Sequence, residues 1–327
     1  MTNQENSSNK TLNNLATREG FGIGLVEAAK KKPDVFGLCA DLDSSMNLVS
    51  FKDRFPDRFV QVGVAEQNLI GVAAGLAIAG KIPFAASFAV FSPGRSWDQI
   101  KVSVAYSKLN VKIVGGHTGV VTGQDGATHH GLEDIALMQS IPLMKVVAPC
   151  DAEQARLATL ALAEDDGPAY LRLTRPKRPT ITPTNQFTLG KAQVLTQGSD
   201  ATIIACGDMV HDALKAEKTL SAQGVSVRVI NMHTIKPLDR AAIIQAANET
   251  KLIVTAEDHQ VYGGMGSSVA QVICQELNHQ ITPEVLFDMV AVQDTFTESG
   301  PEDKLKKKYQ LDDVAICKKI IKLLEHR

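Results

Sequence analysis

Three histidines and one aspartate lie close together in a glycine-rich stretch of the chain. Gly115-Gly116-His117 is followed by the run Gly123-Gln124-Asp125-Gly126-Ala127-Thr128-His129-His130-Gly131. The glycines permit backbone angles with positive φ and a close approach of the main chain to a ligand. Zinc is the rival interpretation, but Asp125, His129 and His130 do not form a regular tetrahedral set and no cysteine lies nearby. We therefore interpret the stretch as one wall of a polar substrate pocket.

One glutamate stands where a predicted strand turns into a predicted helix. Val64-Ala65-Glu66-Gln67-Asn68 opens a segment rich in alanine and glycine. The N–H groups of a first helical turn stabilise a carboxylate placed there, so Glu66 has a purely structural explanation when it is taken alone. Its assignment to a functional site depends on the residues around it.

Two arginines lie at the edges of the same part of the chain. Arg18 is at a predicted helix start and Arg175 at a predicted strand end. From such positions a guanidinium can bind a phosphate with two parallel hydrogen bonds. Because most arginines are solvated surface residues, these two residues alone leave both interpretations open.

Alternating strands and helices must position these residues. Buried strands are predicted at Val35–Cys39, Pro83–Phe88, Val111–Val114, Lys145–Ala148 and Ala169–Leu173. Helices are predicted at Thr17–Lys30, Gln67–Ala79, Trp97–Tyr106 and Ala152–Ala163. The alternation predicts a parallel sheet covered on both faces. Ligands bind beyond the carboxyl ends of such strands, and Asp41, Glu66 and the glycine-rich stretch all follow predicted strands.

A segment with three prolines interrupts the alternation. Pro176, Pro179 and Pro183 lie among polar and basic residues, which is typical of an extended linker. The alternation then restarts, with predicted strands at Ala201–Ala205, Ser226–Ile230, Leu252–Ala256 and Val285–Met289 and predicted helices at Asp212–Ala222, Arg240–Ala247, Ser267–Leu277 and Val314–Leu324. We predict two doubly wound α/β domains, residues 11–176 and 190–327, with a linker over 177–189 and a disordered lead-in over 1–10.

Composition excludes several classes of function. Of the 327 residues, 44% are hydrophobic and 21% charged, as in an ordinary globular protein. The net charge of −2 predicts no attraction to nucleic acid or membranes, and no apolar run has membrane-spanning length. The first ten residues lack the apolar core of a signal peptide, so we expect a cytoplasmic protein. The five cysteines form no CxxC pair, which favours buried, reduced thiols over zinc or redox sites.

In their order along the chain, the motifs resemble the transketolase family of thiamine-diphosphate enzymes, in its pyrimidine-binding domain and its C-terminal domain. The first group is Thr17-Arg18-Glu19, Ala40-Asp41-Leu42, Val64-Ala65-Glu66-Gln67-Asn68, Ser87-Phe88-Ala89-Val90-Phe91, Trp97-Asp98-Gln99-Ile100, Asp125-Gly126-Ala127-Thr128-His129 and Tyr170-Leu171-Arg172-Leu173-Thr174-Arg175-Pro176. The second group is Ile235-Lys236-Pro237-Leu238, Ala256-Glu257-Asp258-His259 with Gly263-Gly264, and Phe296-Thr297-Glu298-Ser299-Gly300. Each motif alone is weak evidence, whereas the ordered set is specific.

The resemblance implies roles for four residues that face the cofactor. Glu66 would hydrogen-bond a ring nitrogen of the aminopyrimidine and favour the imino tautomer, which removes the thiazolium C2 proton. Phe88 and Phe91 would pack on the pyrimidine ring, and Asp41 would lie near the thiazolium edge. Where the family often has a third aromatic residue or an arginine, this chain has Ser92-Pro93-Gly94-Arg95, so the third contact to the pyrimidine is left unassigned.

The resemblance also implies substrate contacts. His129 would act near the C1 hydroxyl and carbonyl of the donor sugar, and Asp125 near its C2 hydroxyl. The positions that hold the substrate phosphate are matched by Arg18, Ser45, His117 and Arg175.

One half of the family's site has no counterpart in this sequence. The Gly-Asp-Gly…Asn signature, which in the family holds the metal and the diphosphate, is absent, and Gly207-Asp208-Met209 does not match it. The resemblance thus implies that no metal ligand comes from this chain. Mg²⁺ (or Ca²⁺) and the diphosphate would be held mainly by a separate N-terminal transketolase subunit. We expect the two subunits to form an α2β2 assembly with active sites at their seam.

The activity that the resemblance implies is transfer of a two-carbon ketol unit between sugar phosphates. Two alternatives use similar halves: a 2-oxo acid dehydrogenase E1 β-subunit, which has no need for phosphate-binding arginines, and a deoxyxylulose-phosphate synthase, which normally carries its domains in one chain. A third is a non-catalytic partner that kept the fold, against which the presence of Glu66 argues.

Overall fold

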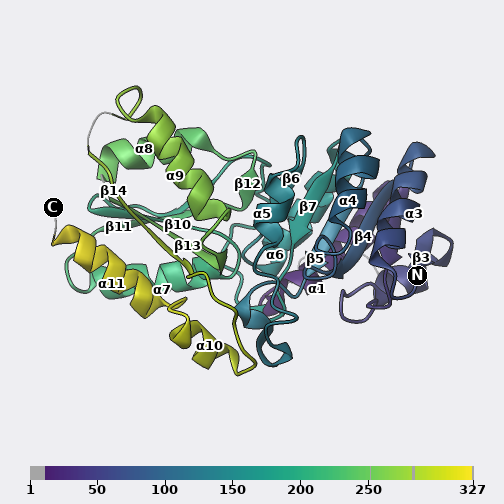
Figure 1. Ribbon diagram of the computed structural model, residues 1–327, viewed down its shortest axis with the longest axis horizontal. Coiled ribbons are helices and arrows are strands. Elements are labelled where there is room, and N and C mark those ends of the chain that lie inside the picture. Colours follow the sequence, from purple (N-terminus) through teal and green to yellow (C-terminus); the bar gives the residue numbers. More distant parts are fainter. Residues whose placement is uncertain (1–11, 251, 282–283, 326–327) are drawn as a thin grey trace, which may run out of the picture.

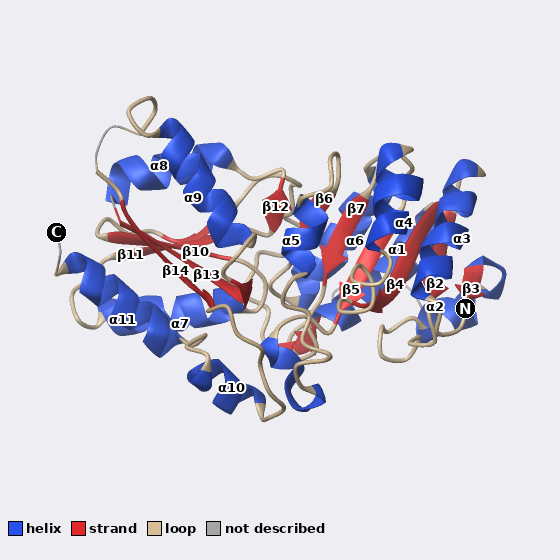
Figure 2. Cartoon of the chain, viewed as in Figure 1, coloured by secondary structure: helices blue, strands red, loops and turns tan. Residues whose placement is uncertain are grey.

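Two twisted sheets lie side by side, each with helices on both faces (Figures 1 and 2). The structure is a computed structural model that describes residues 12–250, 252–281 and 284–325. The predicted lead-in over 1–10 lies outside the described residues. The α/β class predicted from the sequence is confirmed.

The first sheet has seven strands and carries most of the predicted site residues. In spatial order they are β12 (Thr234–Lys236), β6 (Lys145–Val147), β7 (Ala169–Arg172), β5 (Lys112–Gly116), β4 (Ile82–Phe88), β2 (Val35–Cys39) and β3 (Phe59–Gln61). All neighbours pair in parallel except β12, which is antiparallel to β6. Strands buried on both faces are mostly apolar, although Lys112 of β5 and Arg172 of β7 are buried too. This explains why several of them could be predicted as short hydrophobic runs.

Six helices cover this sheet. One face is covered by α1 (Thr17–Lys31), α2 (Val49–Arg54) and α6 (Ala152–Glu164). The other face is covered by α3 (Glu66–Ile78), α4 (Trp97–Gln99) and α5 (Asp134–Gln139). Helix α4 continues as a π-helix over Ile100–Tyr106. Helices α1 and α6 touch closely because Gly20 has no side chain: a Cβ there would lie 2.0 Å from the carbonyl oxygen of Ala152. This contact fixes the position of the start of α1, where Arg18 lies.

The second sheet has five strands. Their order is β14 (Leu286–Val292), β13 (Leu252–Gln260), β10 (Ala201–Ala205), β11 (Val227–Asn231) and β9 (Gln193–Thr196), with only β9 antiparallel to its neighbour. One face is covered by α7 (Met209–Ser221) and α11 (Asp313–Leu324), the other by α8 (Arg240–Thr250) and α9 (Met265–Glu276), while α10 (Glu302–Lys308) lies at the lower edge (Figure 1).

The two halves are joined by more than the linker. Strand β12 comes from the second half of the chain but extends the first sheet, where Thr234 pairs with Val147. The Lys236 ammonium donates to the carbonyls of Gln139 and Ile141 at 2.8 and 2.6 Å. Within the predicted linker, β8 (Lys177–Arg178) pairs with β1 (Leu15–Ala16). One hydrophobic cluster runs through both halves, so each half is rigidly placed against the other.

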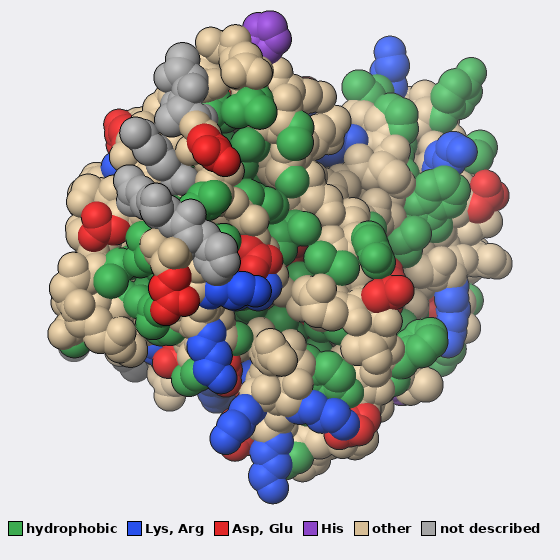
Figure 3. Space-filling view, turned by 60° about the vertical axis from the view of Figure 1, so that its left-hand side comes forward, with side chains coloured by type: hydrophobic (Ala, Val, Ile, Leu, Met, Phe, Trp, Pro, Cys, Tyr) green, Lys and Arg blue, Asp and Glu red, His purple; other side chains and the backbone are tan. Residues whose placement is uncertain are grey.

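The surface carries no dominant apolar face in the view of Figure 3. Hydrophobic side chains are scattered there among polar ones, and basic side chains gather at the lower edge, over α10. No helix in the described part of the chain is both long and apolar enough to cross a membrane.

Candidate functional site

Glu66 is the first residue of α3 and is almost fully buried, with 5% exposure. The helix has no side-chain cap at Ala65, so its first N–H groups and its dipole favour a carboxylate at this point. The carboxylate is also 3.5 Å from the Arg95 guanidinium. A buried acid is therefore aimed at the carboxyl edge of the first sheet.

Four ring side chains, which we call the aromatic group, lie beside one another at this edge. The Phe88 and Phe91 rings are stacked with centroids 5.9 Å apart, and the His117 ring lies 3.8 Å from Phe88. The His129 ring meets the edge of Phe91 at 5.4 Å. The structure thus brings together residues from three separate sequence motifs.

Arg95 links Glu66 to the aromatic group, a contact that the sequence left unassigned. The Arg95 N–H donates to the Phe91 carbonyl at 2.8 Å, and this single turn brings the guanidinium back over the Phe91 ring, 4.4 Å from its centroid. The available signal was an arginine four residues after Phe91, the spacing at which side chains meet across one turn.

His117 has an unusual backbone and an unpaired ring nitrogen. It directly follows β5 with φ of 54°, and its Nδ1 has no hydrogen-bond partner among the described residues. Burial lowers the pKa of His117 to about 3, and the positive charges of Arg18 and Arg175 add to this effect. The imidazole is therefore neutral at physiological pH, with a buried nitrogen free to bind a ligand.

Arg18 and Arg175 line one cavity of about 340 Å³, together with backbone-rich segments of residues 121–124 and 300–302. The Thr174 N–H donates to the Thr17 hydroxyl at 2.7 Å, which ties the start of α1 to the end of β7 and brings the two arginines together. Burial lowers the pKa of Arg18, and the nearby Arg175 lowers it further, although Glu19 opposes this. Two cations that repel each other across a cavity make a site for an anion.

Both arginines are steadied by backbone carbonyls. Arg18 donates to the Ser45 carbonyl at 2.8 Å, so Ser45 contacts the site through its main chain. Arg175 donates to the Thr122 carbonyl at 3.0 Å and lies 3.7 Å from the exposed Asp125 carboxylate. These bonds use one N–H of each guanidinium and leave others for a ligand.

Other sequence candidates lie apart from these contacts. Asp41 has a positive φ of 60°, its side chain is exposed, and its N–H donates to the Gln61 side chain at 2.7 Å. His130 is buried, and both of its ring nitrogens are used within the chain, by Thr297 at 2.7 Å and the Gly123 carbonyl at 2.9 Å. Of the neighbouring pair, His129 therefore faces the site and His130 supports the fold.

The second half of the chain contributes residues that the sequence did not place in the site. Gly300, Pro301 and Glu302 line the cavity opposite Arg175. Only the Phe296–Gly300 motif pointed to this region, and nothing in it indicated proximity to residue 175. Within the described ranges, no group of three or more His, Cys, Asp and Glu residues could hold a metal ion.

Comparisons with known proteins identify the two domains of the chain. The model of the transketolase pyrimidine-binding domain matches residues 13–180, and that of the transketolase C-terminal domain matches residues 190–316. The chain is 43% identical to the 6-deoxy-6-sulfo-D-fructose transketolase subunit SqwH of Clostridium sp., over 88% of each chain. It is 37% identical to one of the apulose-4-phosphate transketolase subunits of Phocaeicola vulgatus, over 96% of this chain and 99% of the relative.

A solved structure has the same architecture. A split gene transketolase, solved as an inactive beta4 tetramer, superposes with a TM-score of 0.87 at 43% identity and covers 95% of this chain and 99% of its own. The two matched domains together span most of the chain, and both relatives are subunits of about its extent. The chain therefore belongs to the transketolase family, in which it is a C-terminal subunit carrying the pyrimidine-binding and C-terminal domains.

Proposed function

We propose that this chain is the C-terminal subunit of a thiamine-diphosphate-dependent transketolase, which transfers a two-carbon ketol unit between sugar phosphates. The observation that carries the proposal is the pairing of two features at one edge of the first sheet. Glu66 and the aromatic group form one feature, and the cavity between Arg18 and Arg175 forms the other.

The first feature fits the aminopyrimidine half of the cofactor. A flat, uncharged heterocycle with ring nitrogens suits a buried carboxylate beside stacked phenyl rings, because the acid can bond a nitrogen and the rings can stack on its face. When bound, thiamine diphosphate supplies the nucleophilic carbon and the electron sink for carbon–carbon cleavage. Phe88, Phe91 and Arg95 hold the pyrimidine, Asp41 lies toward the thiazolium, and Glu66 sets the protonation of the ring nitrogen.

The remaining site residues act on the sugar. His129, at the edge of Phe91, hydrogen-bonds the hydroxyl and carbonyl that react, and Asp125 orients the neighbouring hydroxyl. Arg18 and Arg175, with His117 and the Ser45 backbone, bind the phosphate at the far end. These groups act by orienting the substrate and by stabilising charge where it develops.

The site needs a second polypeptide. The described residues include no group of three or more His, Cys, Asp and Glu side chains that could hold the metal of the diphosphate. We propose that an N-terminal transketolase subunit supplies this half with Mg²⁺ or Ca²⁺, and that two copies of each subunit assemble as α2β2 in the cytoplasm. The relatives of similar extent, both named as transketolase subunits, support the need for a partner subunit.

Reconstitution tests the activity. The chain is mixed with the N-terminal subunit from the same source, thiamine diphosphate and Mg²⁺, and xylulose 5-phosphate with ribose 5-phosphate is the substrate pair. We expect ketol transfer, with no activity from either subunit alone. Activity only with pyruvate would instead support the E1 β-like or deoxyxylulose-phosphate synthase-like alternative, and assembly without any turnover would support a non-catalytic partner.

The same assay identifies the sugar. A relative at 43% identity is named for a sulfosugar, whose sulfonate could occupy the cavity of Arg18 and Arg175 as a phosphate does. Measuring kcat/KM for matched phosphate and sulfonate ketoses decides between the two anions. A preference for the phosphate supports a role in pentose phosphate metabolism.

A further inference from the structure

Residues 117–131, which we call the substrate loop, carry His117, Asp125 and His129 and run between the two halves of the molecule. They include a 3-10 segment over Val120–Asp125. The loop has little regular structure of its own, so bonds from elsewhere must hold it. Two of its external hydrogen bonds come from Asp258, which lies near the end of β13 in the other half of the chain.

Asp258 binds the loop through the main chain. One oxygen of its carboxylate accepts the N–H of Val120 at 2.9 Å, and the other accepts the N–H of Val121 at 3.3 Å. These are the first N–H groups of the 3-10 segment, which no residue within the segment can satisfy. Asp258 thus caps the segment from 137 residues away in sequence.

The loop is shaped to admit this carboxylate. Gly119 has φ of 77°, and a Cβ at this position would lie 2.0 Å from an oxygen of Asp258. Only glycine combines this backbone angle with so close an approach.

Further bonds from the second half support the same loop. The Thr297 hydroxyl bonds His130 at 2.7 Å, and the Ser299 hydroxyl donates to the Gln124 carbonyl. Arg172, at the end of β7, donates to the carbonyls of both Gly131 and Asp258, at 3.2 and 2.8 Å. The beginning, middle and end of the loop are each anchored.

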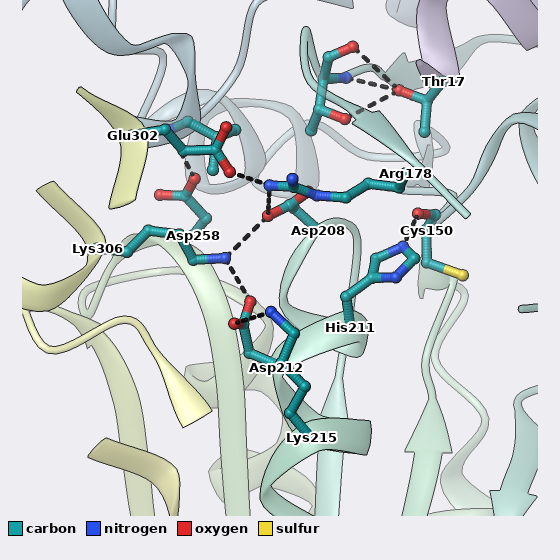
Figure 4. A network of polar contacts seen from close by, with 12 residues as sticks. Thr17, Cys150, Arg178, Asp208, His211, Asp212, Lys215, Asp258, Glu302 and Lys306 are labelled. Carbon is teal, nitrogen blue, oxygen red and sulfur yellow. Dashed lines mark hydrogen bonds and ion pairs between the residues drawn. The ribbon is translucent and has the colours of Figure 1, made fainter. Parts of the chain in front are cut away.

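Among the described residues, the hydrogen bonds of the Asp258 carboxylate both go to the loop. In Figure 4 it lies beside the ion pairs of Arg178, Asp208, Lys306 and Asp212, but Lys306 bonds Asp208 and Asp212 instead. Burial raises the pKa of Asp258 to about 6, despite the opposing effects of Arg172, the Val120 hydrogen bond and Lys306. Burying the Asp258 carboxylate costs folding free energy. A role in holding the substrate loop explains why the chain keeps a charged residue here.

We propose that Asp258 is a positioning residue, through which the C-terminal domain holds the substrate loop where His117, Asp125 and His129 reach the sugar. The effect on the sugar rests on the proposed function, whereas the holding of the loop does not. Asp258 touches neither substrate nor cofactor and acts only through the backbone of residues 120–121.

The test is amide hydrogen exchange of the full chain, wild type against Asp258→Asn. Asparagine keeps the size and one acceptor oxygen but turns an NH₂ group toward the second backbone N–H, so that bond is lost. We expect exchange in residues 118–131 to rise at least tenfold, while the midpoint of urea unfolding stays equal or increases because a buried charge is gone. Unchanged exchange in residues 118–131 overturns the proposal.

Asp151→Asn is the matched control. Asp151 is equally buried and also caps backbone N–H groups, of Gln154 at 2.8 Å and Ile181 at 2.9 Å, but it lies away from the loop. It should accelerate exchange at residues 152–156 and 181–182 and leave residues 118–131 as in the wild type. Equal acceleration of residues 118–131 by both variants would show a general loosening and would overturn the assignment.

A second variant covers the possibility that Asp258→Asn does not fold. Thr297→Val removes the bond to His130 without touching a charge, and it should also accelerate exchange in residues 118–131. In the reconstituted enzyme, both variants should raise KM for the sugar phosphate and lower kcat at least tenfold, with a smaller effect on the affinity for thiamine diphosphate, because Glu66, Phe88 and Phe91 lie outside the loop. If the wild-type pair transfers no ketol, the proposed function fails, and the exchange result still decides the role of Asp258.

Discussion

The two sheets differ in how the charged groups at their carboxyl edges are paired. At the edge of the first sheet, polar groups are left with unused bonding capacity: His117 Nδ1 and Arg18 Nε are buried without partners among the described residues. At the edge of the second sheet, the uncharged atoms Asn231 Oδ1, His233 Nε2 and Gln260 Oε1 also lack partners among the described residues, but the buried charges are matched. Asp208, three residues after β10, is bonded by Arg178 at 2.6 Å and by Lys306 at 3.0 Å.

This difference separates the half that receives a ligand from the half that supports it. Leaving buried polar groups unpaired costs free energy, which a ligand can return on binding. Matched ion pairs and capped backbone groups offer nothing to a ligand but hold two segments together. The same α/β architecture therefore serves binding in one half and positioning in the other, and the following substitutions test this division.

The largest effect is expected at Glu66. Glu66→Ala should leave assembly with the N-terminal subunit intact and lower turnover by about 10²–10⁴-fold, because the group that sets the protonation of the cofactor ring is gone. Steady-state ketol transfer and sedimentation of the complex measure the two properties. Glu153→Ala is the control, since Glu153 is also buried in a first helical turn but pairs with Arg156. Full activity of Glu66→Ala would remove Glu66 from the mechanism.

At the carboxyl edge of the second sheet, we expect a large effect on the free energy of unfolding instead of on turnover. Burial raises the pKa of Asp208, but Lys306 and Arg178 outweigh it and hold this pKa well below its usual range. Asp208→Asn leaves the buried Lys306 and the partly buried Arg178 short of a partner and should cost about 3–5 kcal/mol in urea unfolding at neutral pH. The contribution of Asp208 is present above the pKa of the unfolded chain and is lost as pH falls, so the difference should shrink in acid.

A control at the same network sharpens this result. Glu302 shares Arg178 with Asp208 but is partly exposed. Glu302→Gln should cost under about 1 kcal/mol, as surface pairs do. If Asp208→Asn and Glu302→Gln lowered the free energy of unfolding equally, burial of the carboxylate would not explain the effect of Asp208.

Arg175 should separate binding from stability. Arg175→Leu is expected to raise KM for the phosphorylated ketose by about 10–100-fold, the value of one or two charge-assisted hydrogen bonds, with a smaller effect on an unphosphorylated ketose. Lys177→Leu, a neighbouring exposed cation outside the cavity, is the control. A uniform effect of Arg175→Leu on both ketoses would show that the cavity does not bind the phosphate.

The last predicted effect is a slope of stability with pH, which needs no change in the site. Glu257 is fully buried and accepts the N–H groups of Met265 and Gly266 at 2.6 and 2.8 Å, yet burial raises its pKa to about 7. Because the folded pKa exceeds the unfolded one, its contribution is complete below the unfolded pKa and is lost as pH rises through about 7. Glu257→Gln should remove about 2–3 kcal/mol of this decline between pH 5 and pH 8. Urea unfolding at several pH values tests this, and an unchanged slope would show that another group titrates.

Local sequence determined the elements and the types of residue at their ends. Buried parallel strands are hydrophobic runs and helices repeat every 3.6 residues, so strands such as Ala201–Ala205 were predicted to the residue. Shorter elements were missed: β12 has three residues, and its pairing with β6 joins segments almost 90 residues apart. No local pattern carries that information.

Tertiary structure alone decided which of several similar residues serve the site. His129 and His130 are adjacent in sequence, but one meets Phe91 while the other is bound by Thr297. Nor did any motif connect Asp258 with Val120. The direction of a side chain and its contacts with distant segments are settled only when both sheets are packed. The local sequence does not specify which distant segments will meet, because irregular connecting segments have no fixed direction of their own. The sequence alone thus determined which reactive residue types are present, and the packing of the two halves determined which of them face the site.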